Sequence, residues 1–186
     1  MNLFRVLLVA VLAINAEAAD SSSSAKMDKL VRALSGVWRY GARSPANSQH
    51  PNGTVTQGIE IWRTTSGGAP LVEENHMTID GKESYDYAAI WWNGKAQNAQ
   101  GIWCDAEIND QGCTGFAVTW KGEQIVMSGE YESGGKRFAW RETFERKSED
   151  SLTQTLHIGQ PAEELKLVST IALTKGKDAP AGDHSQ

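Results

Sequence analysis

Apolar and polar residues alternate along most of this chain, in short runs that end at turn residues. From Thr54 onward, turn signals such as Asp80-Gly81 and Asn93-Gly94 recur about every 11 to 15 residues. Asp-Gly and Asn-Gly favour tight hairpins, because both central residues of such a turn need a positive φ. The pattern predicts antiparallel strands at 37–43, 54–63, 70–79, 84–92, 98–106, 114–120, 124–131, 137–146, 151–159 and 165–175.

A different spacing precedes the first strand. Met27, Leu30, Val31 and Leu34 recur with the period of an α-helix, and Gly36 ends the pattern. We therefore expect a flexible lead-in and a short amphipathic helix over 19–35, strands over 36–176 and a disordered tail over 177–186. Because about ten strands in one open sheet would leave two exposed edges, the expected fold is a closed all-β, antiparallel up-and-down barrel, with a two-sheet sandwich as the alternative.

The junction between the helix and the first strand reads Leu34-Ser35-Gly36-Val37-Trp38-Arg39-Tyr40. This Gly-x-Trp opening resembles that of the lipocalin-like (calycin) superfamily, most closely its small secreted bacterial members. The resemblance implies a barrel that holds a small molecule. It also implies a structural role for Gly36 and Trp38, in which the tryptophan closes one end of the barrel.

The first residues have the features of a secretory signal peptide. Arg5 precedes an apolar run from Val6 to Ile14, and Ala16-Glu17-Ala18 supplies the small residues of a cleavage site. The apolar run is too short to span a bilayer. The sequence thus predicts cleavage after residues 1–18 and a secreted or periplasmic protein without a membrane span.

The net charge bears on which partners the protein can bind, and the cysteine content bears on whether it forms a disulfide. The net charge is -5, and an acidic surface repels nucleic acid. Cys104 and Cys113 are the only cysteines, and an even pair in an oxidising compartment is typically bonded. We therefore predict a disulfide across a hairpin tip and no nucleic-acid partner.

Strand alternation predicts which side chains face the barrel interior. For 84–92 two faces compete, one with Tyr85, Tyr87 and Trp91 and the other with Ile90 and Trp92. Elsewhere, the predicted inward residues are Val55, Gln57, Ile59, Ile61; Leu71, Glu73, Asn75, Met77, Ile79; Phe116, Val118, Trp120; Ile125, Met127, Tyr131; Phe138, Trp140, Glu142, Phe144; Leu152, Gln154, Leu156, Ile158; and Leu165, Leu167, Ser169, Ile171, Leu173.

Polar residues on these apolar faces are candidates for ligand binding. A buried carboxylate such as Glu142 needs a partner, since an unpaired one costs several kcal/mol or becomes protonated. The partner is either a ligand in a cavity or a structural group such as Arg39, a backbone donor or water. The predicted ligand-binding residues are Tyr40, Gln57, Glu73, Asn75, Tyr87, Trp140, Glu142, Phe144 and Gln154.

These residues favour a binding protein for a small apolar or amphipathic molecule. The alternative is a cavity enzyme of isomerase, lyase or hydratase type, in which Glu142 transfers protons and Tyr87 or Asn75 polarises the substrate. A third possibility is an interaction domain whose own side chains fill the interior.

Other candidate sites lack part of their pattern. His76 and Glu74 share an outward face without a third metal ligand. The loop with Asp105, Glu107, Asn109 and Asp110 lacks the glycine and the final glutamate of a calcium loop. His157 is a candidate haem ligand, but the glycine-rich opening of haem-binding relatives is absent. We therefore expect neither a metal nor a cofactor.

Overall fold

A computed structural model of the protein describes residues 25–44, 53–65, 70–105 and 107–176. One helix, residues 25–34, precedes the strands. The strands are β1 (Gly36–Ser44), β2 (Thr54–Thr64), β3 (Leu71–Ile79), β4 (Lys82–Asn93), β5 (Asn98–Cys104), β6 (Cys113–Lys121), β7 (Gln124–Ser133), β8 (Lys136–Ser148), β9 (Ser151–Gly159) and β10 (Lys166–Lys175).

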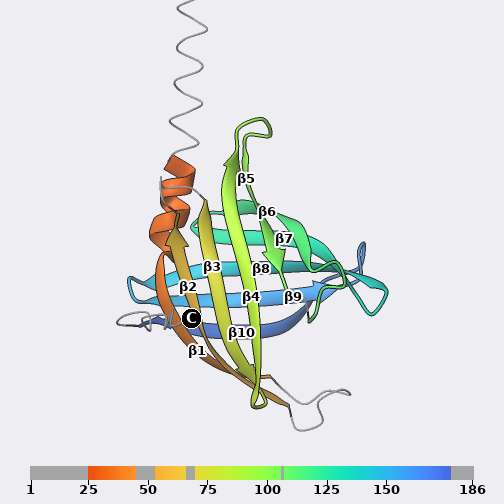
Figure 1. The fold of residues 1–186 in the computed structure, drawn as a ribbon. Coiled ribbons are helices and arrows are strands. Elements are labelled where there is room, and N and C mark those ends of the chain that lie inside the picture. Colours follow the sequence, from red (N-terminus) through yellow and green to blue (C-terminus); the bar gives the residue numbers. More distant parts are fainter. Residues whose placement is uncertain (1–24, 45–52, 66–69, 106, 177–186) are drawn as a thin grey trace, which may run out of the picture.

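The ten strands form one closed barrel, as predicted. Each strand pairs antiparallel with its neighbours in sequence, and β1 pairs antiparallel with β10, where Trp38 lies opposite Lys175. In Figure 1, the first and last strands therefore run side by side. The predicted signal peptide (1–18) and tail (177–186) lie outside the described residues.

The helix covers one end of the barrel. Its residues Leu30 and Leu34 are fully buried, as is Trp38 at the start of β1. Arg146 of β8 donates hydrogen bonds of 3.0 and 3.2 Å to the carbonyl oxygens of Arg32 and Ala33. These carbonyls belong to the last turn of the helix, which has no further amides to satisfy them, so Arg146 fixes the end of the helix to the barrel.

The half of the barrel next to the helix is filled by apolar side chains. Trp62 meets Phe144 edge to face, with ring centroids 6.3 Å apart. The buried apolar residues of this half, drawn from all ten strands, are Trp38, Trp62, Leu71, Ile90, Ala99, Val118, Ile125, Phe144, Leu152 and Leu173. The helix end is thus a packed core, and any interior space lies toward the other end.

The predicted inward faces are correct for β3 and for β6 to β9, where apolar residues mark the inner side. The prediction for β2 is wrong. Glu60 and Trp62 are buried, whereas Val55 and Gln57 are exposed. The inner face of β2 carries a carboxyl group and a glycine at its centre. The β-branched residues that alternate along this strand therefore lie on its outer face.

Two further differences concern β4 and β10. The inner face of β4 carries Asp86 and Ile90. Of the two faces that competed in the sequence, the one with Tyr85 and Tyr87 is therefore the outer face. In β10 a register shift between Leu167 and Ser169 interrupts the alternation. An extra residue in a strand turns the side chains before it toward the opposite face of the sheet. Leu167 is therefore 61% exposed.

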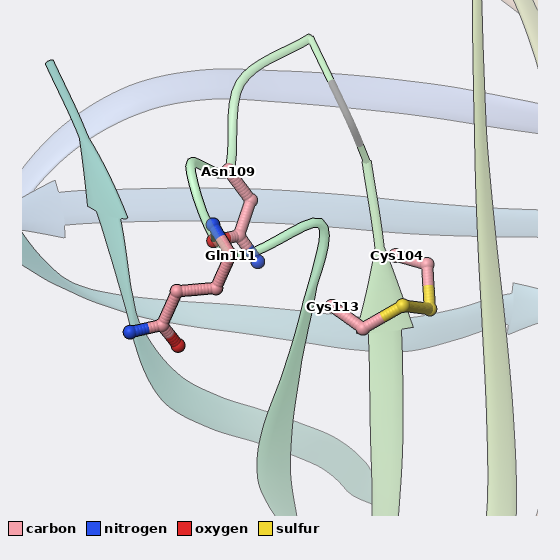
Figure 2. Close-up of a disulfide and its surroundings, with 4 residues drawn as sticks. All are labelled: Cys104, Asn109, Gln111 and Cys113. Atoms are coloured by element: carbon pink, nitrogen blue, oxygen red, sulfur yellow. Dashed lines mark hydrogen bonds between the residues drawn. A yellow bond between two sulfur atoms is a disulfide. The ribbon is translucent and has the colours of Figure 1, made fainter.

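Cys104 and Cys113 form the predicted disulfide. They are direct cross-strand partners at the ends of β5 and β6, and their Cα atoms are 4.0 Å apart. Figure 2 shows the bond at the base of a loop that carries Asn109 and Gln111. Separately, no helix in the described part of the chain is long and apolar enough to cross a membrane.

Candidate functional site

The barrel encloses a cavity of about 370 Å³ in the half away from the helix. This volume is near the lower end of the range for small-molecule sites, so it suits a small ligand. The residues lining the cavity are Tyr40, Ala42, Thr56, Glu60, Glu73, Asn75, Met77, Ile79, Asp86, Trp103, Asp105, Ile108, Tyr131, Trp140, Glu142, Gln154, Leu156, Ile158, Val168, Ser169 and Ile171.

One chain of hydrogen bonds runs across β1, β3 and β4. The Tyr40 hydroxyl donates to Asn75 Oδ1 at 3.0 Å, and Asn75 Nδ2 donates to Asp86 Oδ2 at 3.0 Å. The side chain of Trp103 also hydrogen-bonds Asp86. Burial raises the pKa of the Tyr40 hydroxyl, so this group keeps the proton that it donates to Asn75.

A second set of contacts involves Glu60 and Glu142, which face each other from β2 and β8. Trp62 Nε1 donates to Glu60 Oε2 at 3.2 Å, and Gln154 Nε2 donates to Glu142 Oε1 at 2.7 Å. Burial raises the pKa of Glu60 to about 8, and the Glu142 charge adds to this shift. Burial likewise raises the pKa of Glu142 to about 7.

Glu73 lies between these two sets, on the inner face of β3. No hydrogen bond to its carboxyl group is found among the described residues. Burial first, and then the charges of Asp86, Glu60 and Glu142, raise its pKa well above the usual range. Asp86 itself has its pKa raised to about 7, mainly by burial. The interior therefore holds several carboxylic acids that repel one another when they are ionised.

Aromatic side chains form the facing wall on β5, β7 and β8. Trp103 meets Tyr131 edge to face at 5.9 Å between ring centroids, and it lies 6.3 Å from Trp140 at a tilt. Phe116 supports Trp140 from behind at 5.6 Å. The acids of β2 to β4 thus form one side of the cavity, and aromatic residues of β5, β7 and β8 form the other, which also carries Glu142 of β8.

The loop between β5 and β6 brings a fifth carboxylate to the cavity. Asp105 Oδ1 accepts hydrogen bonds of 2.8 and 3.0 Å from the amides of Glu107 and Ile108. Asp105 is only 2% exposed, and its other oxygen, Oδ2, has no partner. The loop is held in place by Asp110, whose carboxylate accepts from the amide of Gly135 at 3.0 Å.

The structure brings most of the predicted ligand-binding residues to one cavity. Six of the nine candidates line the cavity: Tyr40, Glu73, Asn75, Trp140, Glu142 and Gln154. Three do not. Gln57 is exposed on the outer face of β2, Tyr87 is 49% exposed on the outer face of β4, and Phe144 is buried in the apolar half. Arg39 is exposed, and Glu142 bonds to Gln154 instead.

Five lining residues of chemical interest were not among the candidates: Glu60, Asp86, Trp103, Asp105 and Tyr131. Tyr131 was expected inside, but as packing. One signal could have revealed Glu60. Trp62 lies two residues away on the same strand face, and tryptophan side chains are highly buried on average.

Most of the weaker candidates from the sequence lie away from this cavity, whereas Asp105 of the loop between β5 and β6 lines it. His76 packs edge to face on Tyr85 at 5.0 Å on the outer surface, and Glu74 pairs with Arg63. His157 on β9 is not a cavity-lining residue. Within the described ranges, no group of three or more His, Cys, Asp or Glu side chains is arranged to hold a metal ion.

Comparison with known proteins gives no family for this chain. No protein-family model matches it, and no curated protein matches it either. The geometry of the cavity therefore carries the functional argument.

Proposed function

We propose that this protein is a secreted or periplasmic lipocalin-like barrel that binds a small amphipathic molecule in its interior. The observation that carries the proposal is the cavity of about 370 Å³, with an acidic side and an aromatic side. Small-molecule sites typically combine apolar area with a few polar groups that fix orientation. This composition supports a ligand-binding interior over one filled by the protein's own side chains.

The two ends of the barrel support the same function. The helix and Trp38 seal one end with fully buried side chains. At the other end, Ile108 and Val168 line the cavity and are 41% and 45% exposed. A ligand would therefore enter past these apolar residues and meet the polar groups deeper inside.

Binding of N-phenyl-1-naphthylamine, a neutral fluorophore that brightens in apolar cavities, tests this function. Met77→Trp places a large side chain in the cavity, and Thr78→Trp places it on the outer side of the same strand. We expect Met77→Trp to weaken binding at least about tenfold through lost volume, and Thr78→Trp to leave it unchanged. Equal binding by both variants, each folded by circular dichroism, would mean that the fluorophore binds elsewhere.

Export is part of the proposal and has its own test. The disulfide favours an oxidising compartment, and residues 1–18 have the pattern of a signal peptide. Mass spectrometry of the protein from the exporting host should give a chain that begins at Ala19 with Cys104 bonded to Cys113. A full-length chain retained in the cytoplasm would contradict export.

A further inference from the structure

The charges around the cavity all have one sign. Its lining includes five carboxylic acids, and no Lys, Arg or His from the described ranges. These acids come from the neighbouring strands β2, β3 and β4, from the loop after β5 and from the facing strand β8: Glu60, Glu73, Asp86, Asp105 and Glu142. Buried carboxylates without a cation cost several kcal/mol each or bind protons. The described part of the chain supplies no cation among the lining residues.

An unpartnered oxygen in the same cavity points independently to a missing donor. Asp105 is 98% buried, since its exposed fraction is 2%. Its Oδ1 atom satisfies the loop amides, whereas its Oδ2 atom accepts no hydrogen bond. Gln154 Oε1 is a second lining acceptor without a donor. Buried polar atoms normally have partners, so both oxygens indicate that a ligand brings N–H donors.

The aromatic wall suits the other part of such a ligand. Trp103 of β5 contacts both Tyr131 of β7 and Trp140 of β8, opposite the acids of β2 and β3. Ring faces attract organic cations and cover apolar groups. Trp140 Nε1 also lacks a partner, which gives this wall one free donor.

On these grounds we infer that the ligand is a small organic cation, an amine whose ammonium group lies among Glu60, Glu73 and Asp86 and whose apolar part lies on Trp103 and Trp140. This inference rests on the proposed binding function and adds the charge of the ligand to it. A carboxylic acid ligand would bring a like charge into an acidic interior. A neutral ligand would leave these acids to repel one another or to bind protons.

Two series of matched probes test the inference by isothermal titration calorimetry at about pH 8. Tryptamine, its alcohol tryptophol and its acid analogue indole-3-acetate share one ring system but differ in charge. Octylamine, octanol and octanoate repeat the comparison with an aliphatic chain. We expect an amine to bind at least about tenfold more tightly than its alcohol, the range for a hydrogen bond to a charged group. The acids should show no binding.

Two neighbouring residues provide the variant and its control. Glu73→Gln removes a carboxyl group inside the cavity, and Glu74→Gln removes one from the outer face of the same strand. The Glu73 variant should lose roughly tenfold or more in amine affinity while keeping its affinity for the alcohol. The Glu74 variant should match the unmodified protein with every probe.

The possible results distinguish failure of the cationic-ligand inference from failure of the proposed binding function. If neither amine binds more tightly than its alcohol, the cationic ligand is wrong, although a protein that still binds N-phenyl-1-naphthylamine remains a binding protein. If tryptamine and octylamine do not bind at all, the inference is equally wrong. If the neutral fluorophore also fails to bind, the proposed function itself is contradicted. An amine preference that persists in Glu73→Gln and Asp86→Asn would locate the amine elsewhere and overturn the site.

Discussion

The indole nitrogen of Trp38 donates a hydrogen bond of 2.6 Å to the carbonyl oxygen of Leu34, in the last turn of the helix. Both side chains are fully buried. The contact joins the helix to the first strand across only four residues. The hydrogen bond also gives a partner to the only polar side-chain atom of Trp38, whose ring fills the sealed end of the barrel. Packing and hydrogen bonding by this one residue therefore both stabilise the junction.

Replacement of Trp38 should therefore destabilise the fold strongly. Trp38→Ala should cost about 3 to 5 kcal/mol of unfolding free energy, as large-to-small core changes do. Trp38→Phe keeps most of the ring packing and loses the hydrogen bond, so it should cost less. Chemical denaturation followed by circular dichroism measures both. A loss below about 1 kcal/mol for the alanine variant would show that the helix does not depend on this contact.

Stability should fall as the pH rises through neutrality. The pKa of Glu60 is raised to about 8, and those of Asp86 and Glu142 to about 7. The folded state thus binds more protons than the unfolded chain between about pH 4.5 and 8, and protonated acids stabilise it. The stabilisation is complete below the unfolded pKa and is lost as the pH rises through the folded pKa.

Thermal unfolding without ligand at about pH 5 and pH 8.5 tests this dependence. The titratable groups that line the cavity are Tyr40, Glu60, Glu73, Asp86, Asp105, Tyr131 and Glu142. We expect a loss of at least about 2 kcal/mol at the higher pH. Glu60→Gln should reduce this loss, and Glu74→Gln on the outer face should leave it. A higher stability at pH 8.5 would contradict the burial of these acids.

Gly58 is required where β2 passes Tyr40. A methyl group at position 58 would lie 2.5 Å from the Tyr40 hydroxyl oxygen and 2.8 Å from the main-chain oxygen of His76. Gly58→Ala should therefore displace Tyr40 from Asn75 and cost about 1 to 3 kcal/mol, as overpacking does. Gly41→Ala is the matched control, because no atom lies within 4 Å of the added methyl. Equal stability of the two variants would refute the close approach.

Reduction of the disulfide should weaken both the fold and the cavity. Cys104 and Cys113 are nine residues apart, and closing a loop of this size contributes about 2 to 3 kcal/mol. Asp105 follows Cys104 directly, so the double variant Cys104→Ala, Cys113→Ala should also loosen this lining residue. Denaturation of the variant and of reduced unmodified protein should give the same loss. Unchanged stability in both would show that the disulfide does not contribute to the stability of the fold.

The sequence predicts this fold well because hairpin signals and helix period are local features. Asp80-Gly81 and Lys121-Gly122 lie at turns with positive φ at Gly81 and Gly122, where the pattern expects them. Inner faces follow from alternation wherever the interior is apolar, as with Phe116 and Val118. Closure of the barrel follows from the cost of free edges.

The site is harder to predict, since its interior is polar where alternation assumes an apolar core. On β2 the inner residues Thr56 and Glu60 are more polar than the outer Ile59 and Ile61. The same inversion on β4 places Asp86 inside and Tyr87 outside. Asp105 lies in a loop, where no period applies. These two strands, whose inner faces the alternation does not predict, thus both carry acids of the cavity.

The pairing of β1 with β10 also determines when the protein can fold. Trp38 and Lys175 become neighbours, so the barrel cannot close until β10 has been synthesised. Until then, β1 and the latest completed strand are both free edges, able to pair with other chains. Contacts between such distant residues also form slowly. A nascent chain that stops before β10 would therefore remain prone to aggregation, and truncation at this end should be far more damaging than its few missing side chains suggest.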